Sequence, residues 1–372
     1  MGPITYTFEE LVTHKASGNL PEAALEKLKN EAEETLTKPI VAVTKIDLPR
    51  PSGNPHDYVS IAPYRWPNPD TPDGLPWIPR DGVVNPKTMS GNQPGNLYSR
   101  VATLGLAAFY FPERAKEYAE YVNRQLYDWC INPETYMNPH ALYAQGLPGI
   151  CEGRCSGLID FANSYSFLNS IGILECLGLM DSEILAGVKD WFRRFTDWIL
   201  THDYGLRIDM GGDNHATWHD ANVMGMAFFN QRESLKRNIA ITAYDSRVKK
   251  FIWADGSQQV ELKRTKPIGY SLYNLKAMLI VAKLSEKIGI NKYWTVDEKR
   301  GVCIMKSAVD FLYPYVKNPD SCPYPDLHHG TYGSGLAEAM LAVAKRYPDE
   351  DYAERAKDFI KGTERWLLEP HI

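Results

Sequence analysis

The chain has 372 residues, of which 44% are hydrophobic and 23% charged, and its formal net charge is −5. This composition is typical of a soluble protein with a large core. The acidic balance argues against a general nucleic-acid binder, and no apolar run approaches the roughly 20 residues that a membrane-spanning helix requires.

Helical periodicity dominates the chain. Residues 9–36 predict two short helices separated by Gly18 and Pro21, and the apolar alternation at 37–47 predicts a short strand. Apolar spacing predicts further helices around 97–111, 158–171, 182–200, 216–230, 268–288, 300–313, 334–346 and 351–367. Because no composition break separates them, we expect one all-α domain over residues 1–372, built as an (α/α) toroid of paired helices.

Residues 49–96 interrupt this pattern with a long irregular segment near the N-terminus. The segment is rich in Pro, Gly and Asn, yet it holds the aromatic and basic residues Tyr64, Arg65, Trp66, Trp77 and Arg80. Long irregular segments inside compact domains are functional loops or disorder, and disordered segments are poor in aromatic residues. We therefore expect an ordered lid or groove wall, with part of the 9 Trp and 22 Tyr stacking on sugar rings.

The densest polar and aromatic cluster is DNHATWH, at residues 213–219. The preceding Gly-Gly followed by Asp-Asn predicts a helix start, which places Asn214 and His215 in the first turn. The alternative is a simple N-cap with a half-buried histidine. His215 and His219 have the spacing of a metal-ligand pair, but no glutamate follows the first histidine and no third ligand is evident, so no metal is predicted.

A second cluster, DGSQQVELKRTKPIGYSLY, covers residues 255–273. Arg264 and Tyr270 are expected at a loop-to-helix junction, the alternative being a solvated basic stretch followed by a core tyrosine. The two clusters together suit elimination across C4–C5 of a uronic acid. Asn, His or Arg donors can neutralise the C5 carboxylate, and a Tyr beside an Arg can take the C5 proton and protonate O4, since a cation favours the phenolate.

These residues resemble the alginate lyase superfamily, in particular polysaccharide lyase family 38 and, more distantly, family 5. The matching stretches are PYRWPNP (63–69), GLPWIPRDGVVNP (74–86), INPETYMNPHALYAQGLPG (131–149), GRCSGLID (153–160), NHATWHD (214–220) and DGSQQVELKRTKPIGYSLYNL (255–275). The Arg–Tyr spacing is one residue longer in family 5, which also has a His after the Tyr, where this chain has Ser271. Substrate preference is therefore not transferred from family 5.

The resemblance implies an (α/α) toroid of about six or seven helix pairs and cleavage of alginate that leaves 4,5-unsaturated ends. It implies that Asn214 and His215 neutralise the carboxylate, with His215 also the base for one C5 epimer. It implies a charge-neutralising role for Arg264 and makes Tyr270 the catalytic base and acid. No cofactor or metal is implied.

The expected partner is an acidic polysaccharide. Its predicted binding residues are Tyr64, Trp66, Arg80, Arg154, Asn163, Trp218 and Tyr273. A glucuronan lyase is the first alternative. A glycoside hydrolase on a similar toroid would need an acid pair, for which Asp209, Asp213 and Glu261 are candidates, and a glycan-binding protein would not need Tyr270.

The first residues show no basic start followed by an apolar stretch and a small-residue cleavage site. We expect an exported enzyme, periplasmic or secreted, whose leader is not part of this sequence; a cytoplasmic enzyme is the alternative. Cys151 and Cys155 could form a local disulfide in an exported protein, and they lack the further ligands of a zinc site.

Overall fold

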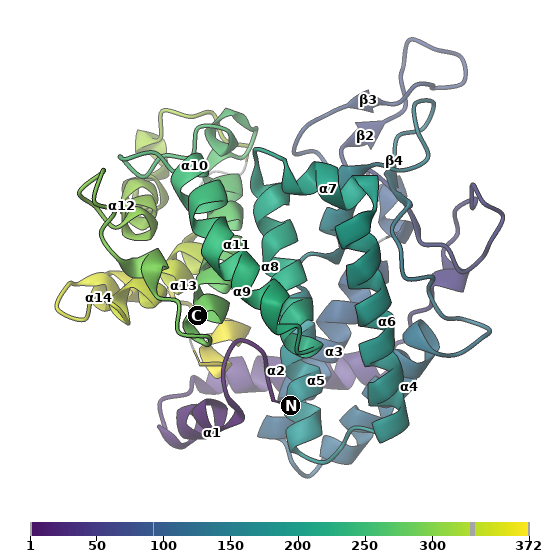
Figure 1. Ribbon diagram of the computed structural model, residues 1–372, viewed down its shortest axis with the longest axis horizontal. Coiled ribbons are helices and arrows are strands. Elements are labelled where there is room, and N and C mark those ends of the chain that lie inside the picture. The colour runs from purple at the N-terminus through teal and green to yellow at the C-terminus, as the bar shows by residue number, and fades with distance from the viewer. Residues whose placement is uncertain (1, 92, 328–331, 371–372) are drawn as a thin grey trace. The chain divides into compact units, whose positions relative to one another are not determined.

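The computed structural model describes residues 2–91, 93–327 and 332–370. Helices supply most of its regular structure, and the strands are short (Figure 1). Its contacts gather into two compact units. Unit 1 comprises Met1–Pro3, Lys29–Gly211 and Gly225–Gln231, and unit 2 comprises Ile4–Leu28, Gly212–Met224 and Arg232–Ile372. The chain, which we predicted as one domain, is described below unit by unit.

The helices of unit 1 form its main packing layer. They are α3 (Gln93–Tyr110), α4 (Ala115–Cys130), α5 (Ser164–Cys176), α6 (Ser182–Thr201) and α7 (Asp203–Asp209). Helix α3 packs against α4 and α5, and α6 contacts α4 and α7 (Figure 1). The Asp181 carboxylate caps α6 by accepting from the backbone N–H groups of Glu183 and Ile184. The apolar stripe of α6, with Trp191 and Phe195, is buried in this unit.

Four short strands, all in unit 1, give order to the irregular segment at 49–96. Strand β1 (Val59–Ile61) pairs in parallel with β4 (Tyr143–Gly146), and β2 (Arg65–Trp66) pairs antiparallel with β3 (Ile78–Pro79). A 3₁₀ turn at Pro86–Gly91 leads into α3. The expected order of this segment is thus confirmed, and its role as a lid or groove wall stays a prediction. Cys151 and Cys155, which follow β4, are both free thiols.

The predicted strand at 37–47 is wrong. This stretch contains only a 3₁₀ turn, Val43–Lys45, although Val41, Ala42 and Val43 are buried. The side-chain amide of Gln125 accepts from the Val41 N–H at 2.8 Å and donates to the Val41 carbonyl at 2.8 Å. A side chain therefore supplies the backbone bonds that a neighbouring strand would otherwise have made.

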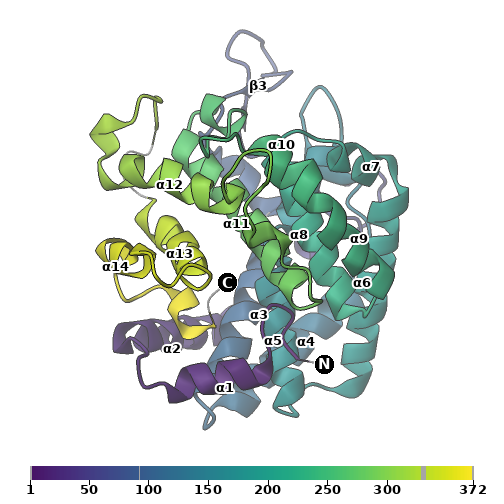
Figure 2. The ribbon, with the colours of Figure 1, turned by 60° about the vertical axis from the view of Figure 1, so that its left-hand side comes forward.

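Unit 2 is also helical. Its helices are α1 (Phe8–Ala16), α9 (Glu233–Ala243), α10 (Lys249–Phe251), α11 (Pro267–Glu286), α12 (Ile304–Lys317), α13 (Gly333–Ala344) and α14 (Tyr352–Ala356). Helices α2 (Glu22–Leu36) and α8 (Asn214–Phe229) each contain residues of both units. Helix α11 packs against α9, α12 and α13 (Figure 2), which explains why its residues are apolar on almost every side.

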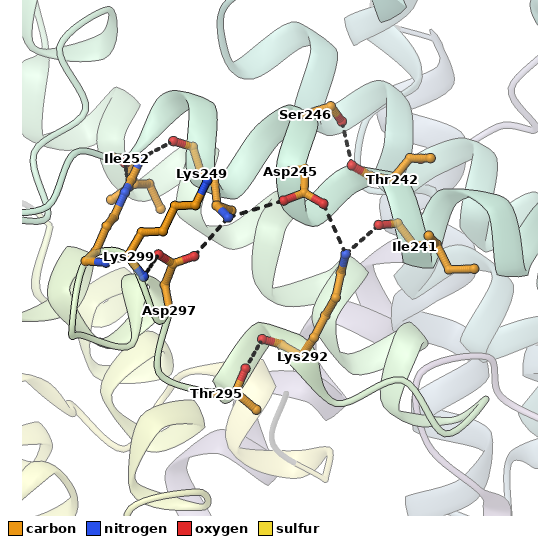
Figure 3. A network of polar contacts seen from close by, with 11 residues as sticks. Ile241, Thr242, Asp245, Ser246, Lys249, Ile252, Lys292, Thr295, Asp297 and Lys299 are labelled. Carbon is orange, nitrogen blue, oxygen red and sulfur yellow. Dashed lines mark hydrogen bonds and ion pairs between the residues drawn. The ribbon is translucent and has the colours of Figure 1, made fainter.

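A π-helical segment, Tyr244–Val248, joins α9 to α10 and is held by a network of charges (Figure 3). The carboxylate of Asp245 lies 3.5 Å from the ammonium groups of both Lys249 and Lys292. Lys249 also pairs with Asp297 at 2.9 Å. These ion pairs connect the chain after α9 to the loop before α12. Asp245 and Lys249 lie just before residues 255–266 in the sequence.

The predicted helices correspond to the observed ones within a few residues over most of the chain. The prediction at 158–171 began too early, because Cys155–Phe161 form a 3₁₀ segment and α5 begins only at Ser164. The prediction at 351–367 was too long, because α14 ends at Ala356 and short 3₁₀ turns follow. None of the helices in the described ranges is long and apolar enough to cross a membrane.

Candidate active site

Asn214 is the first residue of α8 and is held by Glu261 of unit 2. One carboxylate oxygen of Glu261 accepts from the Asn214 backbone N–H at 2.7 Å, and the other accepts from the side-chain Nδ2 at 2.9 Å. Both residues are buried, at 2% and 1% exposure. Loss of hydration raises the pKa of Glu261 above its ordinary value, against the opposing effect of the Asn214 hydrogen bonds.

His215 follows in the same turn, and Asp213 fixes its ring. The Oδ1 atom of Asp213 accepts from the His215 backbone N–H at 3.1 Å and lies 3.2 Å from Nδ1 of the ring. Burial alone would raise the pKa of Asp213, but the hydrogen bonds and charge of His215 keep it below its ordinary value. With Nδ1 turned to a carboxylate, the histidine can present Nε2 to a ligand.

Arg264 and Tyr270 lie at the loop-to-helix junction where the sequence placed them, and their side chains contact each other directly. Arg264 ends the 3₁₀ turn Glu261–Lys263, and its Cζ atom lies 3.8 Å from the centre of the Tyr270 ring. Such a distance is well within cation–π range. The Arg264 N–H donates to the Glu261 carbonyl at 3.0 Å, so the residue that holds Asn214 also belongs to the turn that carries Arg264.

Tyr270 lies in the first turn of α11, where Pro267 occupies the first helical position. Gln258 fixes this turn, because its Nε2 donates to the Ser271 carbonyl at 2.9 Å and its Oε1 accepts from Asn274 at 2.8 Å. Both Gln258 and Asn274 are buried at 1% exposure. The loop with Arg264 and the helix with Tyr270 are thus joined by buried hydrogen bonds, which favours a preorganised pair.

Gly269 brings a further tyrosine against the start of α11. A Cβ atom at Gly269 would lie 2.7 Å from the Tyr332 ring, and the Tyr332 hydroxyl donates to Asp326 at 2.8 Å. Only a residue without a side chain allows this approach. Tyr332 therefore packs directly beside the turn that carries Tyr270.

Trp218 and Tyr273, two of the predicted sugar-binding residues, stack on each other with ring centroids 4.8 Å apart. Trp218 is 1% exposed and therefore lies in the core of unit 2, whereas Tyr273 is half-buried. A fully covered ring does not offer its face to a sugar. Trp218 supports Tyr273 in this structure.

The predicted binding residues of unit 1 include an aromatic hairpin. Arg80 lies over the Trp66 ring at 5.0 Å, and the Trp66 indole N–H donates to the Val83 carbonyl at 3.1 Å. The Arg80 backbone N–H donates to the Tyr64 carbonyl at 2.8 Å, so all three predicted residues belong to the β2–β3 hairpin. The hairpin presents a ring and a guanidinium together.

Arg154 belongs to a second polar group of unit 1. Its Nη2 donates to Oε1 of Gln145 at 2.8 Å, and Nε2 of Gln145 donates to Asp160 at 2.7 Å. Loss of hydration raises the pKa of Asp160 despite its bonds to Ser60, Gln145 and Tyr58. Asn163 precedes α5 in a left-handed conformation, with φ of 65°, and is exposed.

The structure thus brings together Asn214, His215, Arg264, Tyr270, Trp218 and Tyr273 within unit 2, and places the other predicted residues within unit 1. Sequence reasoning missed the roles of Asp213 and Glu261 and considered them only as a hydrolase pair. The signal for Asp213 was its position two residues before the histidine. Glu261 could be recognised only from the fold, because 47 positions separate it from Asn214.

Comparisons with known proteins show the family and the fold of the chain. The family model described as alginate lyase matches residues 42–322. The structure of an alginate lyase from Bacteroides ovatus superposes with a TM-score of 0.92 at 27% identity, over 98% of each chain. Alginate lyase A1-III from Sphingomonas species A1 superposes with a TM-score of 0.59 at 18% identity, over 94% of this chain and 97% of that chain. No curated protein matched the sequence. The expected all-α fold class of the (α/α) toroid type is confirmed.

Proposed function

The chain belongs to the alginate lyase family, and we propose that it cleaves alginate by β-elimination with Tyr270 as base and acid. The observation that carries the proposal is the contact between Arg264 and Tyr270, 3.8 Å from Cζ to the ring centre. A guanidinium over a phenol ring favours the phenolate, which is the form that can accept a proton from carbon. The partial positive charge at the start of α11 acts in the same direction.

The first step requires a stabilised carbanion at C5. Asn214, His215 and Arg264 supply donors and positive charge for the C5 carboxylate, so that charge can spread into it as the C5–H bond breaks. The Tyr270 phenolate takes this proton. The electron pair then forms the C4=C5 double bond while the C4–O4 bond breaks, and the Tyr270 hydroxyl returns the proton to O4.

The face of the sugar that carries the C5 proton decides which base can act. Mannuronate and guluronate are C5 epimers, so their protons lie on opposite faces of the ring. We assign Tyr270 as the base for mannuronate and His215 as the base for guluronate, with Asp213 holding Nδ1 so that Nε2 is the basic atom. With guluronate, Nε2 takes the C5 proton and the Tyr270 hydroxyl gives its own proton to O4. A His215→Ala enzyme that keeps part of its polymannuronate cleavage and loses polyguluronate cleavage would support this assignment, because only the charge-neutralising role is lost with mannuronate. An equal loss on both polymers would refute it.

The predicted residues of unit 1 stay proposed substrate-binding residues. The Trp66–Arg80 pair offers a ring face and a positive charge, which suits a uronate, and the Arg154 guanidinium suits a carboxylate. Tyr64 and Asn163 add a ring and an amide. In unit 2, Tyr273 has the same role with Trp218 behind it.

Glucuronan is the alternative substrate. A hydrolase is less consistent with the site, because Asp213 and Glu261 are engaged with His215 and Asn214 rather than facing each other across an open site. Incubation with polymannuronate, polyguluronate and glucuronan, followed by ultraviolet absorbance of the C4=C5 bond, tests the proposal. Cleavage without an unsaturated product would refute it. We also propose export from the cytoplasm, which fractionation of the native host would test.

A further inference from the structure

Glu261 is a buried carboxylate to which the proposed elimination assigns no step. Its two oxygens accept from the backbone N–H and from Nδ2 of Asn214, at 2.7 and 2.9 Å. A buried carboxylate is costly unless each oxygen has a donor. Its presence beside a site for an anionic sugar therefore calls for a reason.

The geometry of the Asn214 contact explains why residue 261 is a carboxylate. Asn214 presents two donors to residue 261, one from the backbone and one from the side chain, and only a carboxylate offers an acceptor to both. The contact with Nδ2 also decides which end of the amide points toward Glu261. An amide nitrogen carries two hydrogens, so one can bond Glu261 while the second remains for the C5 carboxylate.

The negative charge of Glu261 has a nearby counterpart. Arg264 follows three residues later, and its backbone N–H bonds to the Glu261 carbonyl. The positive charge of Arg264 opposes the rise that burial gives to the pKa of Glu261, as do the Asn214 bonds. Asn214 and Arg264, two of the three residues proposed to meet the substrate carboxylate, are thus both hydrogen-bonded to Glu261.

We propose that Glu261 is a positioning residue for the elimination: it holds the Asn214 amide with Nδ2 as the donor to the C5 carboxylate, on the turn that also carries Arg264. The inference rests on the proposed function. Because this donor strengthens as charge develops in the transition state, its loss should lower kcat more than it raises KM.

The first test is Glu261→Gln, which keeps the shape of the side chain. Its one carbonyl oxygen can still accept from the backbone N–H of residue 214, but its NH₂ group then faces Nδ2. The Asn214 amide must turn over to avoid two opposed donors, which exchanges Nδ2 with Oδ1. We expect kcat to fall about 10²-fold, the usual effect of losing one oxyanion donor, with little change in KM.

A double-mutant cycle separates positioning from general support. If Glu261 acts through Asn214, Glu261→Gln should have almost no further effect on kcat in an Asn214→Ala enzyme. A structural role predicts that the two losses multiply. Glu338→Gln is the matched control, because Glu338 is also buried in unit 2, at 8% exposure, and pairs with Lys276 at 2.9 Å. Its kcat should stay at the wild-type value.

A swapped pair, Asn214→Asp with Glu261→Gln, covers the case in which Glu261→Gln does not fold. The glutamine can accept from the backbone N–H of residue 214 and donate to the new carboxylate, so both hydrogen bonds are restored and only the side-chain bond is reversed in direction. We expect this enzyme to fold and to remain inactive, because residue 214 then has no side-chain donor. Recovered activity would overturn the proposal.

Three assays distinguish failure of this inference from failure of the proposed function. If wild-type enzyme gives unsaturated products and Tyr270→Phe does not, the proposed function stands. Normal kcat in Glu261→Gln would then refute the positioning role alone. Absence of unsaturated products from wild-type enzyme would refute both.

Discussion

Lys283 provides a quantitative test of how unit 2 is packed. It lies in the second half of α11 and is only 5% exposed. Burial, and then the positive charges of Lys345 and Arg346 after α13, lower the pKa of Lys283 from 10.5 to about 7. Glu10 of α1 and Glu286 of α11 oppose this effect without cancelling it. Replacement by methionine keeps the length and flexibility of the side chain and removes the charge.

The difference between 10.5 and about 7 corresponds to about 5 kcal/mol of unfavourable free energy for the charged form in the folded state. Below pH 7 Lys283 is protonated in both states, so the folded protein bears this cost in full. Between about pH 7 and pH 10.5 the unfolded chain retains the proton that the folded protein has lost. Stability therefore rises with pH over that range.

We expect Lys283→Met to raise the free energy of unfolding by up to about 5 kcal/mol at pH 6, and by much less at pH 10. Urea unfolding followed by tryptophan fluorescence at both pH values measures this difference. Lys357→Met is the control, because the Lys357–Glu354 pair is exposed and such pairs contribute about 0–1 kcal/mol. Equal stability of Lys283→Met and wild type at pH 6 would refute the reasoning.

Three further predictions concern the site. Asp213→Asn leaves His215 without its carboxylate partner, so kcat in steady-state assays should fall by about 10–100-fold, while circular dichroism shows an intact fold. A normal kcat would exclude the proposal that Asp213 orients the His215 ring. Gly269→Ala places a Cβ atom 2.7 Å from the Tyr332 ring and should lower both the melting temperature and kcat. The control is Gly212→Ala, whose Cβ meets open space and should change neither. Equal melting temperatures of the two variants would contradict this packing. Dialysis against a chelator should leave activity unchanged, because side chains supply the charge neutralisation, and activity restored only by added Ca²⁺ or Zn²⁺ would contradict that assignment.

Much of the helical fold could be predicted from the sequence, for reasons visible in single helices. Helix α6 has a continuous apolar stripe and an aspartate cap, so its prediction at 182–200 was correct almost to the residue. Residues 37–47 have an alternating apolar pattern without a strand, because Gln125 takes the place of a neighbouring strand. A pattern of burial shows that backbone bonds must be made, but not which group makes them.

The kinds of residue in the candidate site could be predicted from the sequence, but the contacts between distant residues could not. Arg264 and Tyr270 are six positions apart, so their place at a loop-to-helix junction could be expected from local spacing, whereas the stacking of the guanidinium on the ring is visible only in the fold. The contact between Asn214 and Glu261 spans 47 positions and depends on how the loop folds back onto α8. Burial of Trp218 likewise depends on tertiary packing, since an aromatic residue in a helix suits a core and a sugar-binding surface equally.

The proposed mechanism depends on the Tyr270 hydroxyl as both base and acid, and one comparison of two enzymes tests this role directly. Wild-type and Tyr270→Phe enzymes are incubated with polymannuronate while ultraviolet absorbance records the C4=C5 bond. The substitution removes one oxygen and should cost at most about 1–3 kcal/mol of stability, so a thermal melt should show a folded protein. Because the hydroxyl fills two roles, and each acid or base role contributes about 10²–10⁴-fold, we expect the rate to fall by several orders of magnitude. A folded Tyr270→Phe enzyme with nearly the wild-type rate would contradict the mechanism.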